Sequence, residues 1–300
     1  MKRLVCALLG LTLCMGVLAA CGPGDSSGGG SSSGGGSASS SVPDGSSSGG
    51  SAVVVCRIID EDDGSLLLAK QDGGSGDVYR LDASGLPVTL EGESSAADEI
   101  ESGMLVEVCY DGGVMETFPA QLGSVTSINV RSEGFDDLAE LYLDVLEDLW
   151  EVDSGLNENI TELGVDLSGT RLSAAEQSAV AWAFGEEHGL APVQGTYEEL
   201  LEQGYITGEP LEGSDAKFYQ WADGCLFSIR EKESKVAFSL PTVQEGEDSP
   251  LKDYHVSDTV TFDAQKWRSG TGAYFFSDCT SVRGSSGEWS DYQVGGEAIS

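Results

Sequence analysis

A long segment of glycine and serine limits where this chain can fold. Residues 22–52 of the 300 are almost entirely Gly and Ser. Such a composition buries too little apolar surface to offset its ordering entropy, so we expect a disordered tether with an end-to-end distance of about 30 Å. Folded structure is therefore expected in residues 53–300, a stretch long enough for two small cores.

The residues before the tether have the three parts of a secretory signal peptide. Lys2 and Arg3 precede an uncharged apolar run, and small residues stand at its end, just before Cys21. The run is shorter than the roughly 20 residues that a membrane-spanning helix needs. We therefore predict that residues 1–20 are a signal peptide and that residues 21–52 begin the mature chain.

The sequence Leu18-Ala19-Ala20-Cys21 resembles the lipobox of bacterial lipoproteins. The resemblance implies that the Cys21 thiol receives a diacylglyceryl group, carrying fatty acids such as palmitate, and that cleavage leaves Cys21 as the first residue. Two acyl chains anchor a protein stably, whereas one binds only marginally. We expect a lipid-anchored protein of the cell membrane that faces the extracytoplasmic side.

The charge of the chain narrows the choice of partners. Without Lys2 and Arg3, 13 basic residues stand against 51 acidic ones, a net charge of −38. Nucleic acids and anionic lipid surfaces require clustered Lys and Arg, so we expect neither as a partner. The acidity is interpreted mainly as a source of solubility.

The first folded segment, residues 53–131, has short β-rich runs separated by turn signals. Asp111-Gly112-Gly113 predicts a hairpin turn, and residues 82–101 are expected to leave the sheet. Together the runs predict a small, closed or partly closed β-barrel of OB-like size. The expected strands are Val53–Ile59, Ser65–Lys70, Asp77–Leu81, Gly103–Tyr110, Val114–Phe118 and Val125–Arg131.

The segment Met115-Glu116-Thr117-Phe118-Pro119-Ala120-Gln121, which follows the strand Gly103–Tyr110, resembles part of an uncharacterised OB-like domain of exported Gram-positive proteins. The resemblance implies a fold and a cellular address but no activity.

The second folded segment, residues 135–300, begins with helical patterns. Its first helix repeats apolar residues at helical spacing, and the other two open with capping boxes. The helices are expected over Asp136–Val152, from Ser173-x-x-Glu176 to about Gly189, and from Thr196-x-x-Glu199 to Gly204.

Strand patterns with a period of two follow the helices, so we predict an α+β domain with an antiparallel sheet. A helix packed into a curved sheet, in a cystatin-like or nuclear-transport-factor-like outline, is the expected architecture. The chain as a whole is thus predicted to be α+β and multidomain. The expected strands are Cys225–Arg230, Lys235–Leu240, Thr259–Phe262, Ala273–Cys279 and an arm around Trp289–Val294.

Four cysteines remain beyond Cys21, and an exported chain can form disulfides. One bridge per domain would join Cys56 to Cys109 and Cys225 to Cys279. The alternation of side chains along a strand argues against the Cys56–Cys109 bridge. Cys56 shares a face with the apolar Val54, whereas Cys109 shares one with Glu107, so the two cysteines are expected on different faces. The alternative is that all four are small buried hydrophobic residues.

An aromatic and a cation stand together in Trp267-Arg268, before two glycines. Exposed, this pair would stack on a sugar ring or hold an anionic group, and Trp289 would extend the surface. We therefore name Trp267, Arg268 and Trp289 as candidate ligand-binding residues. The alternative interpretation is core packing next to a Gly-rich turn.

Catalytic and metal-binding patterns are weak. Asp278-Cys279 invites comparison with cell-wall cysteine peptidases, but no His follows it, and His188 and His255 are the only histidines. The calcium-like segments 60–64 and 73–77 lack the required ligand spacing and are expected to be turns. The sequence thus predicts no cofactor and no metal site.

The function predicted from these features is binding rather than catalysis, with an unidentified ligand on the concave face of the second domain's sheet. The first alternative is a structural or assembly module that contacts envelope proteins. The second is a cell-wall hydrolase, which the missing base and metal spacing disfavour.

The lipobox interpretation predicts the fate of one thiol. In cells fed an alkyne-tagged palmitate, the wild-type chain should be labelled, and Cys21→Ser should abolish the label because no thiol remains for the diacylglyceryl group. Cys14→Ser, inside the signal peptide, is the matched control and should keep the label. Labelled Cys21→Ser protein would contradict the interpretation.

Overall fold

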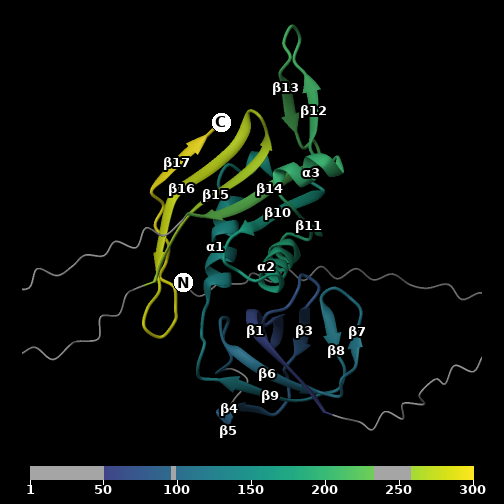
Figure 1. Cartoon of the computed structure of the whole chain (residues 1–300), viewed down its shortest axis with the longest axis vertical. Coiled ribbons are helices and arrows are strands. Elements are labelled where there is room, and N and C mark those ends of the chain that lie inside the picture. Colours follow the sequence, from purple (N-terminus) through teal and green to yellow (C-terminus); the bar gives the residue numbers. More distant parts are fainter. Residues whose placement is uncertain (1–50, 96–98, 233–257) are drawn as a thin grey trace, which may run out of the picture. The chain divides into compact units, whose positions relative to one another are not determined.

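A computed structural model describes residues 51–95, 99–232 and 258–300. These described residues belong to one compact unit, and they form two β-sheets and three α-helices (Figure 1). The predicted α+β class is confirmed. No helix in the described part of the chain combines the length and the apolar composition that a bilayer crossing requires.

The first sheet has nine strands, and its hydrogen-bonded order is β5-β4-β9-β6-β1-β2-β3-β8-β7. In the residues described, this path is open, with β5 and β7 at its two ends. Its strands are β1 (Ala52–Asp62), β2 (Ser65–Lys70), β3 (Val78–Asp82), β4 (Val88–Leu90), β5 (Glu93–Ser95), β6 (Leu105–Tyr110), β7 (Val114–Met115), β8 (Ala120–Leu122) and β9 (Val125–Arg131).

The expected strands of this sheet are present, but two expected connections are wrong. Asp111-Gly112-Gly113 does not join a hairpin, because β6 pairs with β1 and β9 while β7 pairs with β8. Residues 82–101 do not all leave the sheet, because β4 and β5 extend it beside β9. Both errors concern strand pairing, which depends on residues distant in the sequence.

The second half of the chain supplies the helices and the eight-stranded second sheet. In it, β11, β10, β14 and β15 are consecutive neighbours, and β15 also pairs with β13 and β16. The elements are α1 (Leu138–Glu151), a 3-10 turn (Ser154–Leu156), β10 (Glu162–Gly169), α2 (Ala174–Glu187), β11 (Pro192–Gln194), α3 (Tyr197–Gln203), β12 (Thr207–Pro210), β13 (Lys217–Gln220), β14 (Gly224–Glu231), β15 (Thr259–Ser269), β16 (Gly272–Val282) and β17 (Gly296–Ile299).

All three predicted helices are confirmed, because their signals are local. Ser173 and Thr196 each accept a hydrogen bond from the backbone N–H three residues later, which completes both capping boxes. Gly204 ends α3 with a positive φ of 87°. The apolar positions predicted for the first helix are all buried on α1.

The expected order of helices first and an antiparallel sheet afterwards is wrong at two strands, because β11 lies between α2 and α3 and β10 also precedes α2. β10 lies between α1 and α2 in the sequence and pairs in parallel with both β11 and β14. The pairing of β14 with β15 and of β15 with β16 is antiparallel, as predicted. The expected strand Lys235–Leu240 lies outside the described residues.

Helices α1 and α2 form a layer, here called the helix layer, that packs against both sheets. One buried cluster joins residues of both helices to β10, β14 and β15 and also to Ile59, Leu67, Ala69 and Val78 of the first sheet. The run Leu66–Ala69 on β2 is buried on both faces, because Leu66 and Leu68 belong to the first sheet's other core. The two segments expected to be separate domains thus share buried side chains.

Small side chains let α2 approach both sheets. Ala175, Ala179 and Ala183 are buried on this helix, which contacts β1, β2 and β3 on one side and β10 on the other. Side chains of this size occupy little space between the helix backbone and its neighbours. The same alanines give the helix its weakly segregated apolar pattern.

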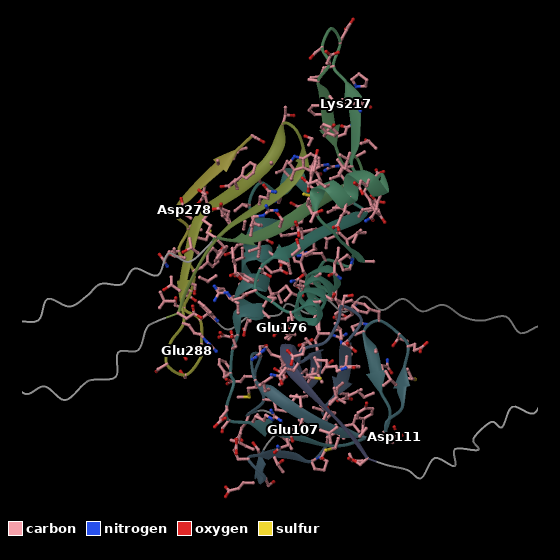
Figure 2. The ribbon with its side chains drawn as sticks, in the orientation of Figure 1. Glu107, Asp111, Glu176, Lys217, Asp278 and Glu288 are labelled. Carbon is pink, nitrogen blue, oxygen red and sulfur yellow. The ribbon has the colours of Figure 1, made fainter. Side chains whose placement is uncertain are left out.

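Arg57 on β1 links the first sheet to the helix layer. Its Nε donates to Glu176 of α2 at 3.0 Å, and its Nη1 donates to the carbonyls of Gly103, Gly134 and Asp136 at 2.8 to 3.3 Å. Both side chains of the ion pair are less than one-fifth exposed. Figure 2 labels Glu176 on α2. The pair therefore ties the connection before α1, the first sheet and α2 together.

Loss of this link should destabilise the chain. We expect Arg57→Ala to lower the free energy of unfolding by about 3 kcal/mol, because it leaves a largely buried carboxylate and three carbonyls without their donor. Arg131→Ala, which breaks the more exposed Arg131–Glu107 pair, is the control and should cost about 1 kcal/mol or less. Urea unfolding of the full chain measures both, and equal losses would contradict this role for Arg57.

Candidate functional site

The predicted ligand-binding residues lie in different surroundings. Cys21 is outside the described residues. Trp267 on β15 is partly buried and packs against the small apolar cluster beneath α3. Its ring meets Tyr197 edge-to-face, with 5.0 Å between centroids. The Trp267 ring therefore packs against another aromatic side chain of the protein.

Arg268 donates its guanidinium hydrogens to backbone carbonyls. Nη1 reaches the oxygens of Leu156 and Glu158, both at 3.1 Å, and Nη2 reaches that of Ala222 at 2.9 Å. These bonds hold the 3-10 turn and the residues before β14 against β15. In the structure the side chain therefore fastens backbone segments to one another.

Trp289 is 8% exposed and belongs to the large core that contains the helix layer. Its backbone N–H donates to Asp137 at 2.7 Å, and its indole Nε1 donates to Asp136 at 2.8 Å. These contacts fix the start of α1. The structure places Trp267 and Trp289 in different hydrophobic clusters and does not bring them together.

The four cysteines beyond Cys21 are free thiols. Cys56, Cys225 and Cys279 are buried, whereas Cys109 is partly exposed. Cys56 lies opposite Val106 in the ladder, and Cys109 lies opposite Val53. Burial raises the pKa of the Cys56 and Cys225 thiols to about 12 and that of Cys279 to about 11. At neutral pH these three groups are thiols and not nucleophilic thiolates.

Other ionisable groups of catalytic type serve packing. The ring of His188 stacks on Trp150 with 3.7 Å between centroids and contacts Glu147 at 3.0 Å. Burial lowers the pKa of Lys266, whose ammonium group donates to Asn157 and to the backbone carbonyls of Trp150 and Val152 at the end of α1. Within the described residues, no group of three His, Cys, Asp or Glu side chains is arranged to hold a metal ion.

An open pocket of about 400 Å³ lies where the first sheet meets α2 and β11. Aromatic and aliphatic side chains form most of its lining, with Glu186 as its charged member. We call it the Phe118 groove, and its lining consists of Phe118, Trp182, Gly185, Glu186, Gly189, Leu190, Ala191, Pro192 and Gln194.

The end of α2 forms the floor of the Phe118 groove. A Cβ atom on Gly185 would lie 2.5 Å from the carbonyl oxygen of Leu190 and 2.8 Å from Pro192 Cδ, so only glycine permits this approach. The Leu190 N–H donates to the Gly185 carbonyl at 2.8 Å, and Gly189 has a φ of +66°. The chain therefore turns sharply after the helix and passes directly into β11.

Trp182 is held in the wall by a cation from the first sheet. The Arg80 guanidinium lies 4.5 Å from the centre of the Trp182 ring and forms two hydrogen bonds of 2.7 Å to the two carboxylate oxygens of Glu186. Stacking and a bidentate pair fix the indole and the carboxylate together. One wall of the groove, formed by Trp182 and Glu186, is therefore fixed before any ligand binds.

The opposite wall is an exposed apolar surface on the first sheet. Val114, Met115 and Phe118 are 46%, 54% and 49% exposed, and they lie on β7 and in the loop before β8. The loop is shaped by Thr117, whose hydroxyl donates to the Pro119 carbonyl at 2.8 Å. Three large apolar side chains exposed within residues 114–118 indicate that this hairpin takes part in an interaction.

The sequence interpretation did not identify this groove. Phe118 attracted notice only as part of a family resemblance, and Trp182 stands in an alanine-rich helix without a motif around it. One available signal was the continuous apolar run Leu66–Ala69. Such a run indicates a strand that is buried on both faces, and therefore a second layer of structure packed on the first sheet.

Comparisons with known proteins do not assign this chain to a family or to a known fold. No protein-family model matches the chain, and searches of curated proteins and of solved structures find no match.

Thiol reactivity tests the description of the cysteines. In the folded, lipidated chain at pH 8, we expect Cys109 to react readily with a maleimide. Cys56, Cys225 and Cys279 should react slowly, because their raised pKa values leave about one part in a thousand or less as thiolate. After unfolding without reductant, all four cysteines should react with the maleimide, and mass spectrometry would count the labels. Fewer than four reactive thiols would reveal a disulfide and contradict the free-thiol state.

Proposed function

We propose that this chain is a lipid-anchored extracytoplasmic protein that acts by binding, and that the Phe118 groove is its binding site. The signal peptide, Cys21 and the Gly/Ser tether support the address. A tethered and strongly acidic body suits a protein that must stay soluble beside a membrane and reach a partner.

The groove is the observation that carries this proposal. It is open, mostly apolar and partly built by a fixed tryptophan, which are common properties of binding sites. Its ionisable lining residue, Glu186, is already paired with Arg80. The site therefore offers shape and apolar surface, and binding accounts for it better than catalysis does.

Between a small ligand and a protein partner, we favour the protein. The groove is open, and the strand that precedes Phe118 carries two more exposed apolar residues, Val114 and Met115. Such a surface agrees with the assembly module described above, which contacts envelope proteins. Binding of a small ligand at Trp267, Arg268 and Trp289 stays the alternative, although Arg268 already donates to three carbonyls.

We also keep the more specific fold assignments, OB-like for the first sheet and cystatin-like or nuclear-transport-factor-like for the second half, as proposals. An OB-like fold for the first sheet is supported by its run of short strands, and a cystatin-like or nuclear-transport-factor-like outline by α1 packed on β14 and β15. A hydrolase is not proposed, because the three buried thiols are protonated and His188 is engaged in packing.

Ligand-induced stabilisation tests the proposed site. The full lipidated chain in detergent would be heated with muropeptides, glycans, peptides and calcium in turn. A ligand at about 100 times its dissociation constant should raise the midpoint by roughly 5–10 °C. Phe118→Ala should remove the shift, because it deletes one wall of the groove without disturbing a buried core.

Leu211→Ala is the matched control, since Leu211 is also a large exposed apolar residue, at 46%, and lies away from the groove lining. It should leave the shift intact. A shift that survives Phe118→Ala would place binding elsewhere, and the absence of any shift would contradict binding of these ligand classes.

A further inference from the structure

The Phe118 groove runs beside a free strand edge. β11 is the last strand at its end of the second sheet, and among the residues described it pairs with β10 alone. The ladder places Val193 opposite Gly164, and the Gly195 N–H donates to the Val165 carbonyl at 3.2 Å. Successive N–H groups of a strand point to opposite sides, so the N–H of Gln194 points away from β10.

Backbone groups on this edge are placed for an added strand. The carbonyls of Pro192 and Gln194 point to the same side as the Gln194 N–H, again by alternation along the strand. Gln194 is exposed, and its side chain is held aside by Ser178, whose hydroxyl donates to its amide oxygen at 3.1 Å. One donor and two acceptors are therefore available along a stretch of three residues.

The groove supplies side-chain contacts for such a strand. Pro192 and Gln194 of the edge also line the groove, next to Trp182 and Leu190. A peptide extended along β11 would direct every second side chain into this apolar space, while its backbone bonds to the edge. Edge addition combined with pockets for alternate side chains is a recurring mode of peptide recognition.

Charge identifies the kind of peptide. Arg80 balances the charge of Glu186 in the groove, but the next residue, Glu187, is exposed, and so is Glu116, two residues before Phe118. The whole chain carries 51 acidic against 15 basic residues. A second copy of the chain would bring like charge to an acidic rim, which is repulsive, whereas a basic segment is attracted.

We propose that the Phe118 groove takes an extended, basic segment of a partner protein, which adds as a strand to the free edge of β11 and places alternate apolar side chains between Phe118 and Trp182. The inference rests on the proposed function and names the partner chemistry for the same site.

Selection from a random library of nine-residue peptides tests it on the full lipidated chain in detergent. Enriched peptides should alternate apolar residues with Lys or Arg, and replacing the basic residues by Glu should weaken binding at least tenfold. Gln194→Pro should weaken binding about five- to tenfold, because it removes the outward N–H while the bonds of Val193 and Gly195 to β10 remain. Gln194→Ala removes the same side chain but keeps the N–H, so the difference in affinity between the two variants measures the contribution of the backbone bond.

Backbone methylation of the peptide gives a second readout that does not depend on the folding of a variant. Methylating one peptide N–H at a time should weaken binding at alternate positions, because only every second N–H faces β11.

Each outcome is decisive. Binding that needs Phe118 but ignores Gln194→Pro and shows no alternation would overturn strand addition and leave the proposed site intact. Binding that ignores Phe118→Ala would overturn the proposed site as well. Enrichment without basic residues, or no enrichment at all, would overturn the basic peptide as occupant.

Discussion

The burial of helix α2 between two sheets is the contact on which the rest of the structure depends. The helix contacts both β2 and β10, and its buried alanines take up little space between the helix and its neighbours. Arg57 adds a polar link at this contact, because its guanidinium reaches Glu176 of α2 and the carbonyls that lead into α1. Side chains of the helix layer thus pack in one buried cluster with residues of both sheets.

The Phe118 groove is a consequence of this packing. It forms at the end of α2, where Gly185 lets the chain turn closely into β11, and where Arg80 of the first sheet fixes Trp182 and Glu186. The end strand β11 of the second sheet and Phe118, from the connection between β7 and β8 of the first sheet, both line the groove in this arrangement. The apolar space and the free strand edge therefore have one origin, and the tether and acidic charge suit its use as a docking site.

Local signals in the sequence predicted local structure well. The capping residues Ser173 and Thr196 and the terminator Gly204 located two helices, because each acts within a few residues of itself. Strand pairing was harder: β10 joins β14 in parallel across some sixty residues, and no short motif encodes that register. The groove was beyond reach for the same reason, since Phe118 and Trp182 meet only after both sheets pack on α2. Trp267 and Trp289 drew attention by residue type, yet type alone does not reveal which neighbours surround a side chain.

Native-state hydrogen exchange tests the central claim, that the two sheets share the helix layer, most directly. The amides of β1 and β2 and those of β10 and β14 would be followed in the full chain as denaturant is added. A shared core predicts that the slowest amides of both sheets open together, with one common free energy. If the amides of one sheet stayed protected after those of the other had exchanged, the two halves would unfold independently and the helix layer would not be common to them.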